Sequence, residues 1–212
     1  MKKTNLIIFS IILISFAIVA YLYPSMPYYM ASHWDARGNV DAYGPKCWAL
    51  FFMPFFSLFL WLLYIIIPKI DPLKENIEKF RKYYDWFFIL ITVFFLYVHL
   101  LSLSWNLGLK FDMSAAMIPA LSLLFFYCGI LIEHSQMNWF VGIRTPWTLS
   151  SETVWQKTSR VGERFFKILA VFFLASLFFP EFPSILAMIL LLPLFVIFLV
   201  VYSYLEYRKE KK

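Results

Sequence analysis

Long, predominantly apolar runs recur along this chain and constrain its fold more than any other feature. The six runs cover residues 6–23, 47–67, 85–107, 113–133, 165–179 and 184–205. A stretch of about 18 or more apolar residues is long enough to cross a bilayer as a helix. The pattern therefore predicts an all-α, polytopic membrane bundle with six transmembrane helices, in which 165–179 is the shortest span.

The composition and the distribution of charge support a membrane bundle. Hydrophobic residues make up 62% of the chain and charged residues 15%, whereas soluble domains average about 25% charged residues. With six spans, basic residues gather on one side, at positions 2–3, 69–82, 144–164 and 208–212. The other side carries only Arg37, Lys46 and Lys110. The positive-inside rule then predicts cytoplasmic termini in the cell membrane, and the net charge of +6 gives no separate indication of nucleic-acid binding.

This topology suggests two regions. Residues 1–70 hold the first two spans and an extracytoplasmic loop at 24–46, and residues 71–212 hold four spans and a polar cytoplasmic segment at 138–164. The outer loop concentrates polar, aromatic and glycine residues suited to recognition from outside. They are His33, Trp34, Asp35, Gly38, Asp41, Tyr43 and Gly44.

Two interpretations of the outer loop remain open. His33, Asp35 and Asp41 could supply three ligands to a metal ion, but no fourth ligand and no zinc-helix spacing accompany them. A structural loop turned at Gly38 and Gly44 is favoured. No nucleophile lies beside a base, so we expect no enzyme activity, no cofactor and no metal.

The segment 138–164 is too polar to cross a bilayer and strongly patterned. Gly142 and Thr145–Pro146 predict a bent, non-helical corner carrying Arg144. Ser150 or Ser151 can cap a following helix, with Glu152 in its first turn.

That helix has two faces. Its apolar face holds Val154, Thr158, Val161 and Phe165, and its basic face holds Lys157, Arg160 and Arg164. The pattern predicts a helix lying in the inner membrane interface. Trp139 and Trp147 fit the same aromatic belt. The segment is then either a positive-inside loop with aromatic anchors or a platform that docks an acidic partner.

His99 suggests a different function. It is the one ionisable residue well inside a predicted span, and ionisable groups at membrane depth are functional candidates. The alternative function is a small transporter or channel with His99 in its polar pathway, against a simpler role as a buried, hydrogen-bonded histidine.

The sequence NWFVGIRTPWTLSSETVWQKTSRVG resembles the signature of the SdpI family of bacterial immunity proteins. The matching residues are Asn138, Phe140, Gly142, Arg144, Thr145, Pro146, Trp147, Trp155, Thr158 and Gly162. Ser159 and Glu163 depart from it, since histidine and glycine are frequent there. The outer loop is similar to the small uncharacterised domain that often precedes this signature.

The resemblance implies a multispan protein that protects its producer against a secreted peptide toxin. In the best-known system such a protein also acts as a receptor that holds a cytoplasmic transcriptional repressor at the membrane. The expected partners are the lipid bilayer, the toxin and such a repressor. The signature residues, together with Lys157 and Arg160, are the expected binding and output residues.

Overall fold

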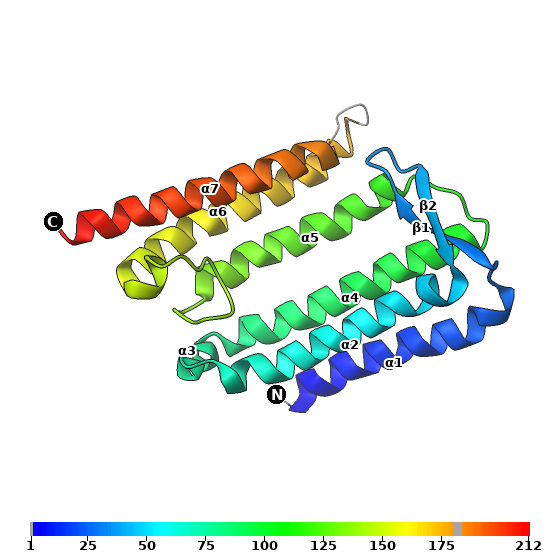
Figure 1. The fold of residues 1–212 in the computed structure, drawn as a ribbon, viewed down its shortest axis with the longest axis horizontal. Coiled ribbons are helices and arrows are strands. Elements are labelled where there is room, and N and C mark those ends of the chain that lie inside the picture. The colour runs from blue at the N-terminus through cyan, green and yellow to red at the C-terminus, as the bar shows by residue number, and fades with distance from the viewer. Residues whose placement is uncertain (1, 180–183) are drawn as a thin grey trace. The chain divides into compact units, whose positions relative to one another are not determined.

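The computed structural model describes residues 2–179 and 184–212 (Figure 1). Seven α-helices occur in this described part: α1 (Lys2–Leu22), α2 (Lys46–Ile70), α3 (Lys74–Lys79), α4 (Arg81–Asn106), α5 (Met113–His134), α6 (Glu152–Ser176) and α7 (Ser184–Glu210). Two short 3-10 helices, Tyr23–Ser25 and Thr148–Ser150, accompany them. The helical character is confirmed, but the expectation of an all-α fold misses one element. Strands β1 (Tyr29–Trp34) and β2 (Val40–Pro45) pair within the segment that was expected to be a loop.

Five segments among the described residues are long and apolar enough to cross a membrane. They are Lys2–Ser25, Lys46–Ile70, Arg81–Asn106, Met113–His134 and Leu186–Glu210. The predicted span 165–179 is not among them, because it belongs to a longer helix whose first half is polar.

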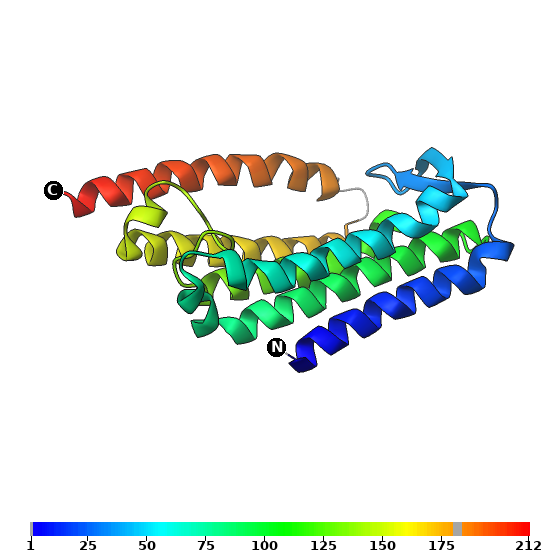
Figure 2. The same ribbon diagram turned by 60° about the horizontal axis from the view of Figure 1, so that its bottom comes forward.

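That longer helix corrects the expectation of a separate interfacial helix. Residues Glu152–Ser176 form one uninterrupted helix, α6, that runs beside α7 (Figures 1 and 2). The polar and apolar halves are joined because no helix-breaking proline separates them. Lys167 lies within the apolar half, where its Nζ donates to carboxylate oxygens of Glu133 and Glu163, each at 2.8 Å.

The chain divides into two compact units. The first contains residues 1–64 and 88–120, and the second contains residues 65–87 and 121–212. In the first unit, α1, α2 and α4 run side by side (Figure 2). Ring contacts fix their register: Phe16 lies 5.3 Å from Phe55, and Phe56 lies 4.9 Å from Phe95, between ring centroids.

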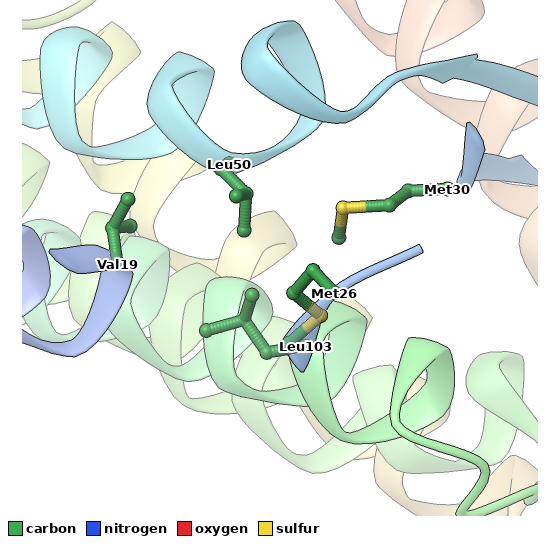
Figure 3. Packing of buried hydrophobic residues seen from close by; sticks show 5 residues of the cluster. All are labelled: Val19, Met26, Met30, Leu50 and Leu103. Atoms are coloured by element: carbon green, nitrogen blue, oxygen red, sulfur yellow. The ribbon is translucent and has the colours of Figure 1, made fainter. Parts of the chain in front are cut away.

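A small apolar cluster closes the hairpin end of the first unit. Figure 3 shows Val19 from α1, Leu50 from α2 and Leu103 from α4 converging on Met26 and Met30, which belong to the segment leading into the hairpin and to β1. All five are buried. The hairpin is therefore packed onto the ends of three helices, and its position does not depend on its two strands alone.

An asparagine at the end of α4 holds the hairpin. Its Oδ1 accepts a hydrogen bond from the backbone N–H of Ala31 at 2.7 Å, and its Nδ2 donates to the carbonyl of the same residue at 3.1 Å. The Asn106 amide thus pairs with the outer edge of β1 as a third strand would. Beside it, the rings of Trp34 and Trp105 meet edge to face at 5.7 Å.

The second unit packs its helices closely. A Cβ at Gly129 of α5 would lie 3.0 Å from the backbone carbonyl oxygen of Glu163, so glycine permits the approach of α5 and α6. The rings of Phe165 in α6 and Phe195 in α7 stack with centroids 3.5 Å apart.

Candidate functional site

The signature segment begins with a cluster of hydrogen bonds around Asn138. This side chain is fully buried, and its Oδ1 accepts hydrogen bonds from the backbone N–H groups of Phe140 and Val141 at 2.9 and 2.6 Å. Its Nδ2 donates to the carbonyls of Gln136 and Val141 at 2.7 and 2.8 Å. Asparagine can both donate and accept here, so one side chain satisfies four backbone groups that no helix or sheet serves.

Residues of the turn between α2 and α3, which are distant in the sequence, bind to this cluster of hydrogen bonds. Asp71 is buried, and its two carboxylate oxygens accept from the backbone N–H groups of Leu73 at 2.7 Å and Trp139 at 2.9 Å. Asn76 of α3 donates from Nδ2 to the carbonyl of Met137 at 2.8 Å. The contacts of Asp71 with Trp139 and of Asn76 with Met137 fix the start of the segment within the second unit.

Gly142 forms the predicted corner and seats a tryptophan. Its φ of 113° lies in the region that favours glycine. A Cβ there would lie 2.9 Å from Cζ2 of Trp155 and 3.2 Å from Oγ of Ser135. The buried Trp155 indole donates from Nε1 to the carbonyl of Ser135 at 2.9 Å. Trp155 thus supports the corner from inside.

The residues that follow make a buried hydroxyl network. Thr148 accepts at Oγ1 from the Thr145 backbone N–H at 2.8 Å and donates to the carbonyl of Ile143 at 2.9 Å. Thr145 Oγ1 donates to Ser203 Oγ of α7 at 2.9 Å. Pro146 lies exposed at the bend. The corner is therefore fastened to α7 as well as to α6.

The start of α6 agrees with the sequence. Ser151 is the N-cap residue and accepts at Oγ from the Val154 backbone N–H at 3.2 Å, and Glu152 occupies the first turn. The Ser151 hydroxyl also donates to Glu210 Oε2 at 2.6 Å. On the inward face, Thr158 is fully buried, and its hydroxyl has no hydrogen-bond partner among the described residues.

The three residues of the predicted basic face of α6 have different roles. Lys157 Nζ lies 2.8 Å from Glu206 Oε2 of α7, and Lys209 Nζ lies 2.6 Å from the other carboxylate oxygen. The hydrogen bond to Glu206 raises the pKa of Lys157 above its ordinary value. Arg160 and Arg164 are exposed on α6. All three side chains are exposed, but the lysine also serves the contact between α6 and α7.

Arg144 is exposed but held in place. Its Nη1 donates to the backbone carbonyl of Trp139. Trp139 is 50% exposed and Phe140 36% exposed, so two aromatic rings accompany this cation at the surface. Trp147 instead packs against Tyr204 of α7, with ring centroids 5.2 Å apart. The exposed residues Trp139, Phe140, Arg144, Pro146 and Arg160 are together named the signature surface below.

The outer-loop residues lie on the hairpin in the first unit. His33 Nδ1 and Asp41 Oδ1 are 2.5 Å apart across the strands. Asp35 turns the other way and accepts at Oδ1 from the backbone N–H groups of Arg37 and Asn39. The Asn39 N–H is the main cause that lowers the pKa of Asp35.

The hairpin geometry separates the three side chains that could have formed a metal site. No group of three His, Cys, Asp or Glu side chains arranged to hold a metal ion is found in the described residues. Gly38 has a φ of 79° in the hairpin turn, as the turn interpretation predicts. Tyr43 is exposed, Gly44 is buried in β2, and Trp34 packs on Trp105.

Sequence reasoning missed four residues that complete the signature segment. They are Asp71, Asn76, Ser203 and Glu206. Asp71 also accepts from the Leu73 backbone N–H in the turn before α3. A carboxylate at the end of an apolar run, such as Glu206, is the one signal that could have indicated a buried ion pair.

These features define the class of protein. Five apolar helices of spanning length and a helical fold make the chain a multi-pass membrane protein. Comparison with known proteins shows what the chain is similar to. Residues 135–204 match the SdpI/YfhL protein family, and residues 10–58 match a domain of unknown function, DUF1648.

One curated relative matches almost the whole chain. The immunity protein SdpI of Bacillus subtilis (strain 168) is 26% identical over 207 residues, which cover 98% of this chain and 97% of that protein. No solved structure matches the chain. The family match includes the signature segment and α7 as far as residue 204, so the Thr145–Ser203 contact lies within it, whereas Glu206 and Glu210 lie beyond its end.

Proposed function

We propose that this protein is a membrane immunity protein that protects its cell against a secreted killing peptide. The observation that carries the proposal is the likeness to an immunity protein over 98% of the chain. A binding role is also supported by the polar groups of the segment, which are used in backbone contacts around Asn138 and Thr148.

The topology we propose has six spans with both termini in the cytoplasm. Its support is the pairing of α6 with α7: Lys157 contacts Glu206, and Phe165 contacts Phe195, so the two helices run antiparallel along their length. If α7 crosses the membrane, the apolar half of α6 beside it crosses as well. Adding α6 to the five apolar spans gives an even number, which returns the chain to its starting side.

Cysteine labelling in intact cells tests this topology. In a chain without Cys47 and Cys128, a cysteine at Arg144 should react with an impermeant maleimide only after the cells are opened. A cysteine at Arg37, on the hairpin turn, should react without opening. Labelling of the first position in intact cells would refute the proposed sidedness.

Within this topology the two polar regions have separate roles. The hairpin, with His33, Asp35, Asp41 and Tyr43 toward its exposed side, meets the peptide from outside the cell. The signature surface is the cytoplasmic output, and it would hold an acidic patch of a transcriptional repressor. Its support is the exposed charge of Arg144, which contacts the half-exposed Trp139, and the exposed charge of Arg160.

Survival of a toxin-sensitive bacterium tests the function. Cells that lack their own immunity protein are given this chain and challenged with the killing peptide of the relative's system. We expect protection by the parent chain and its loss with Arg144→Gln or Trp147→Ala, at unchanged abundance in the membrane. Lys212→Gln and Trp86→Ala are matched controls that remove a cation or an exposed ring elsewhere. Full protection by both signature variants would count against the role of the signature segment.

A separate experiment tests the repressor. A bacterial two-hybrid assay between the chain and the transcriptional repressor of the relative's system should give a signal that needs the peptide and that Arg144→Gln removes. A signal independent of the peptide would contradict a sensing role, while leaving protection itself intact.

A further inference from the structure

His99 is a buried imidazole that the proposed function does not use. It lies in α4 with an exposed fraction of 0%, and neither ring nitrogen has a hydrogen-bond partner among the described residues. The simple expectation of a buried, hydrogen-bonded histidine is therefore wrong for this structure. Buried polar groups are nearly always paired, so an exception requires a physical explanation.

The helix register places other polar groups at the same level. His99 is four residues before Leu103, and Ser15 is four residues before Val19, so each lies one helical turn from the apolar cluster of Figure 3. Ser15 is 3% exposed. Both side chains fall on the buried stripes of their helices, at the level directly inward from the cluster.

Helix α2 contributes a backbone oxygen at this level. Pro54 is buried one turn after Leu50 and has no N–H group. The carbonyl of Leu50 therefore lacks the donor that an α-helix normally provides from the fourth residue along. An oxygen freed in this way in a membrane helix needs another donor.

We propose that His99, Ser15 and the Leu50 carbonyl form a proton-binding site inside the first unit, with the imidazole as the base. The groups suit both states of the ring. A neutral ring can accept from the Ser15 hydroxyl, and a protonated ring can donate one N–H to the serine oxygen and the other to the carbonyl. Protonation thus adds one N–H donor, so the charged ring can use both oxygens as acceptors, whereas the neutral ring can donate to only one.

No other charge competes at this level. α1 has no titratable side chain between Lys3 and Tyr21, and α2 has none between Cys47 and Tyr64. In α4 the only other titratable group between Asp85 and Asn106 is Tyr97, whose hydroxyl donates to the carbonyl of Ala116 at 2.8 Å. Residues 113–120 of α5 carry none, and Met26 and Met30 are the hairpin-side residues of the cluster.

Protonation would therefore place a single positive charge among α1, α2 and α4. Because apolar surroundings penalise an isolated charge, the ring is neutral at rest and its protonation draws the two oxygens toward it. Methionine side chains adapt easily, so Met26 and Met30 can adjust as the cluster next to the site shifts. The site gives the bundle a proton-dependent state that is independent of any transport.

Histidine NMR on the full chain in lipid nanodiscs tests the site. The chain has three histidines, so ¹⁵N-labelling gives three ring patterns, and H99N identifies the one of interest. We expect that ring to change from the neutral to the imidazolium pattern as the pH is lowered while the protein stays folded. S15A should lower its proton affinity roughly tenfold, as the loss of one hydrogen bond to a charged group implies.

The control is H33N, which removes an exposed histidine of the hairpin and should leave the midpoint of His99 unchanged. Two results would overturn the proposal: a His99 ring that stays neutral at every pH at which the protein is folded, or a midpoint that S15A does not move. S15A keeps the imidazole, so the test remains decisive if H99N fails to fold. None of these outcomes depends on protection against a killing peptide.

Discussion

Replacing Asn138 should open the signature segment locally. Its side chain makes four hydrogen bonds to backbone groups, two as acceptor and two as donor. A net hydrogen bond contributes about 1 kcal/mol, so Asn138→Ala should cost roughly 4 kcal/mol of local stability at these contacts. Since about 1.4 kcal/mol is a factor of ten, the open population should rise by up to about three orders of magnitude.

A graded series sharpens this prediction. Asn138→Asp keeps the two acceptor bonds but faces carbonyl oxygens with a carboxylate, so it should open the segment less than alanine does. Asn76→Ala removes one bond to the segment, the donation to Met137, and should change the open population by about fivefold. The order of opening is therefore parent, Asn76→Ala, Asn138→Asp and Asn138→Ala.

Limited trypsin digestion of the solubilised protein measures the opening. Cleavage after Arg144 requires the corner to unfold, and its rate follows the open population when reclosing is fast. Mass spectrometry of the fragments identifies the site, and cleavage in the C-terminal tail after Arg208 provides an internal standard. If Asn138→Ala were cut after Arg144 no faster than Asn76→Ala, the inference that Asn138 organises the corner would be wrong.

Three further outcomes follow from the structure. Gly142→Ala should lower stability by about 2 kcal/mol in thermal unfolding because of its positive φ, and more than Gly108→Ala, which has a positive φ but open space around it. The pKa of Asp35 is lowered, so its contribution to hairpin stability is present above the carboxyl's unfolded pKa and lost as pH falls through the folded pKa. The protection of hairpin amides relative to their intrinsic exchange rate should therefore fall on acidification, and Asp35→Asn should remove that dependence. The pKa of Lys157 is raised, so its contact with Glu206 stabilises below the unfolded lysine pKa and is lost as pH rises through the folded one; Glu206→Gln should abolish this alkaline loss in a thermal scan.

Local signals in the sequence predicted much of the fold. Apolar runs of spanning length located the helices, because a bilayer demands internally satisfied backbone over a fixed thickness. Gly142 and Pro146 located the corner, and Ser151 located the start of α6. Each of these features depends on residues within one or two turns of chain, which is why they could be read in order along the sequence.

The contacts that fasten the candidate site are long-range and gave no local signal. Asp71 binds the backbone of Trp139 from 68 positions away, and Lys157 binds Glu206 from 49 positions away. In the sequence, a basic helix face has the same pattern whether its charges face solvent or a buried carboxylate. The hairpin was missed for another reason: its register shifts between Ala31 and His33, which interrupts the alternation expected of a strand.

The pairing of Asn106 with Ala31 joins the hairpin to the end of α4 through two hydrogen bonds. Two parallel hydrogen bonds between an amide and a peptide unit resist sliding along the strand and fail together when pulled apart. A ligand that displaced β1 from α4 would therefore have to break both of these hydrogen bonds.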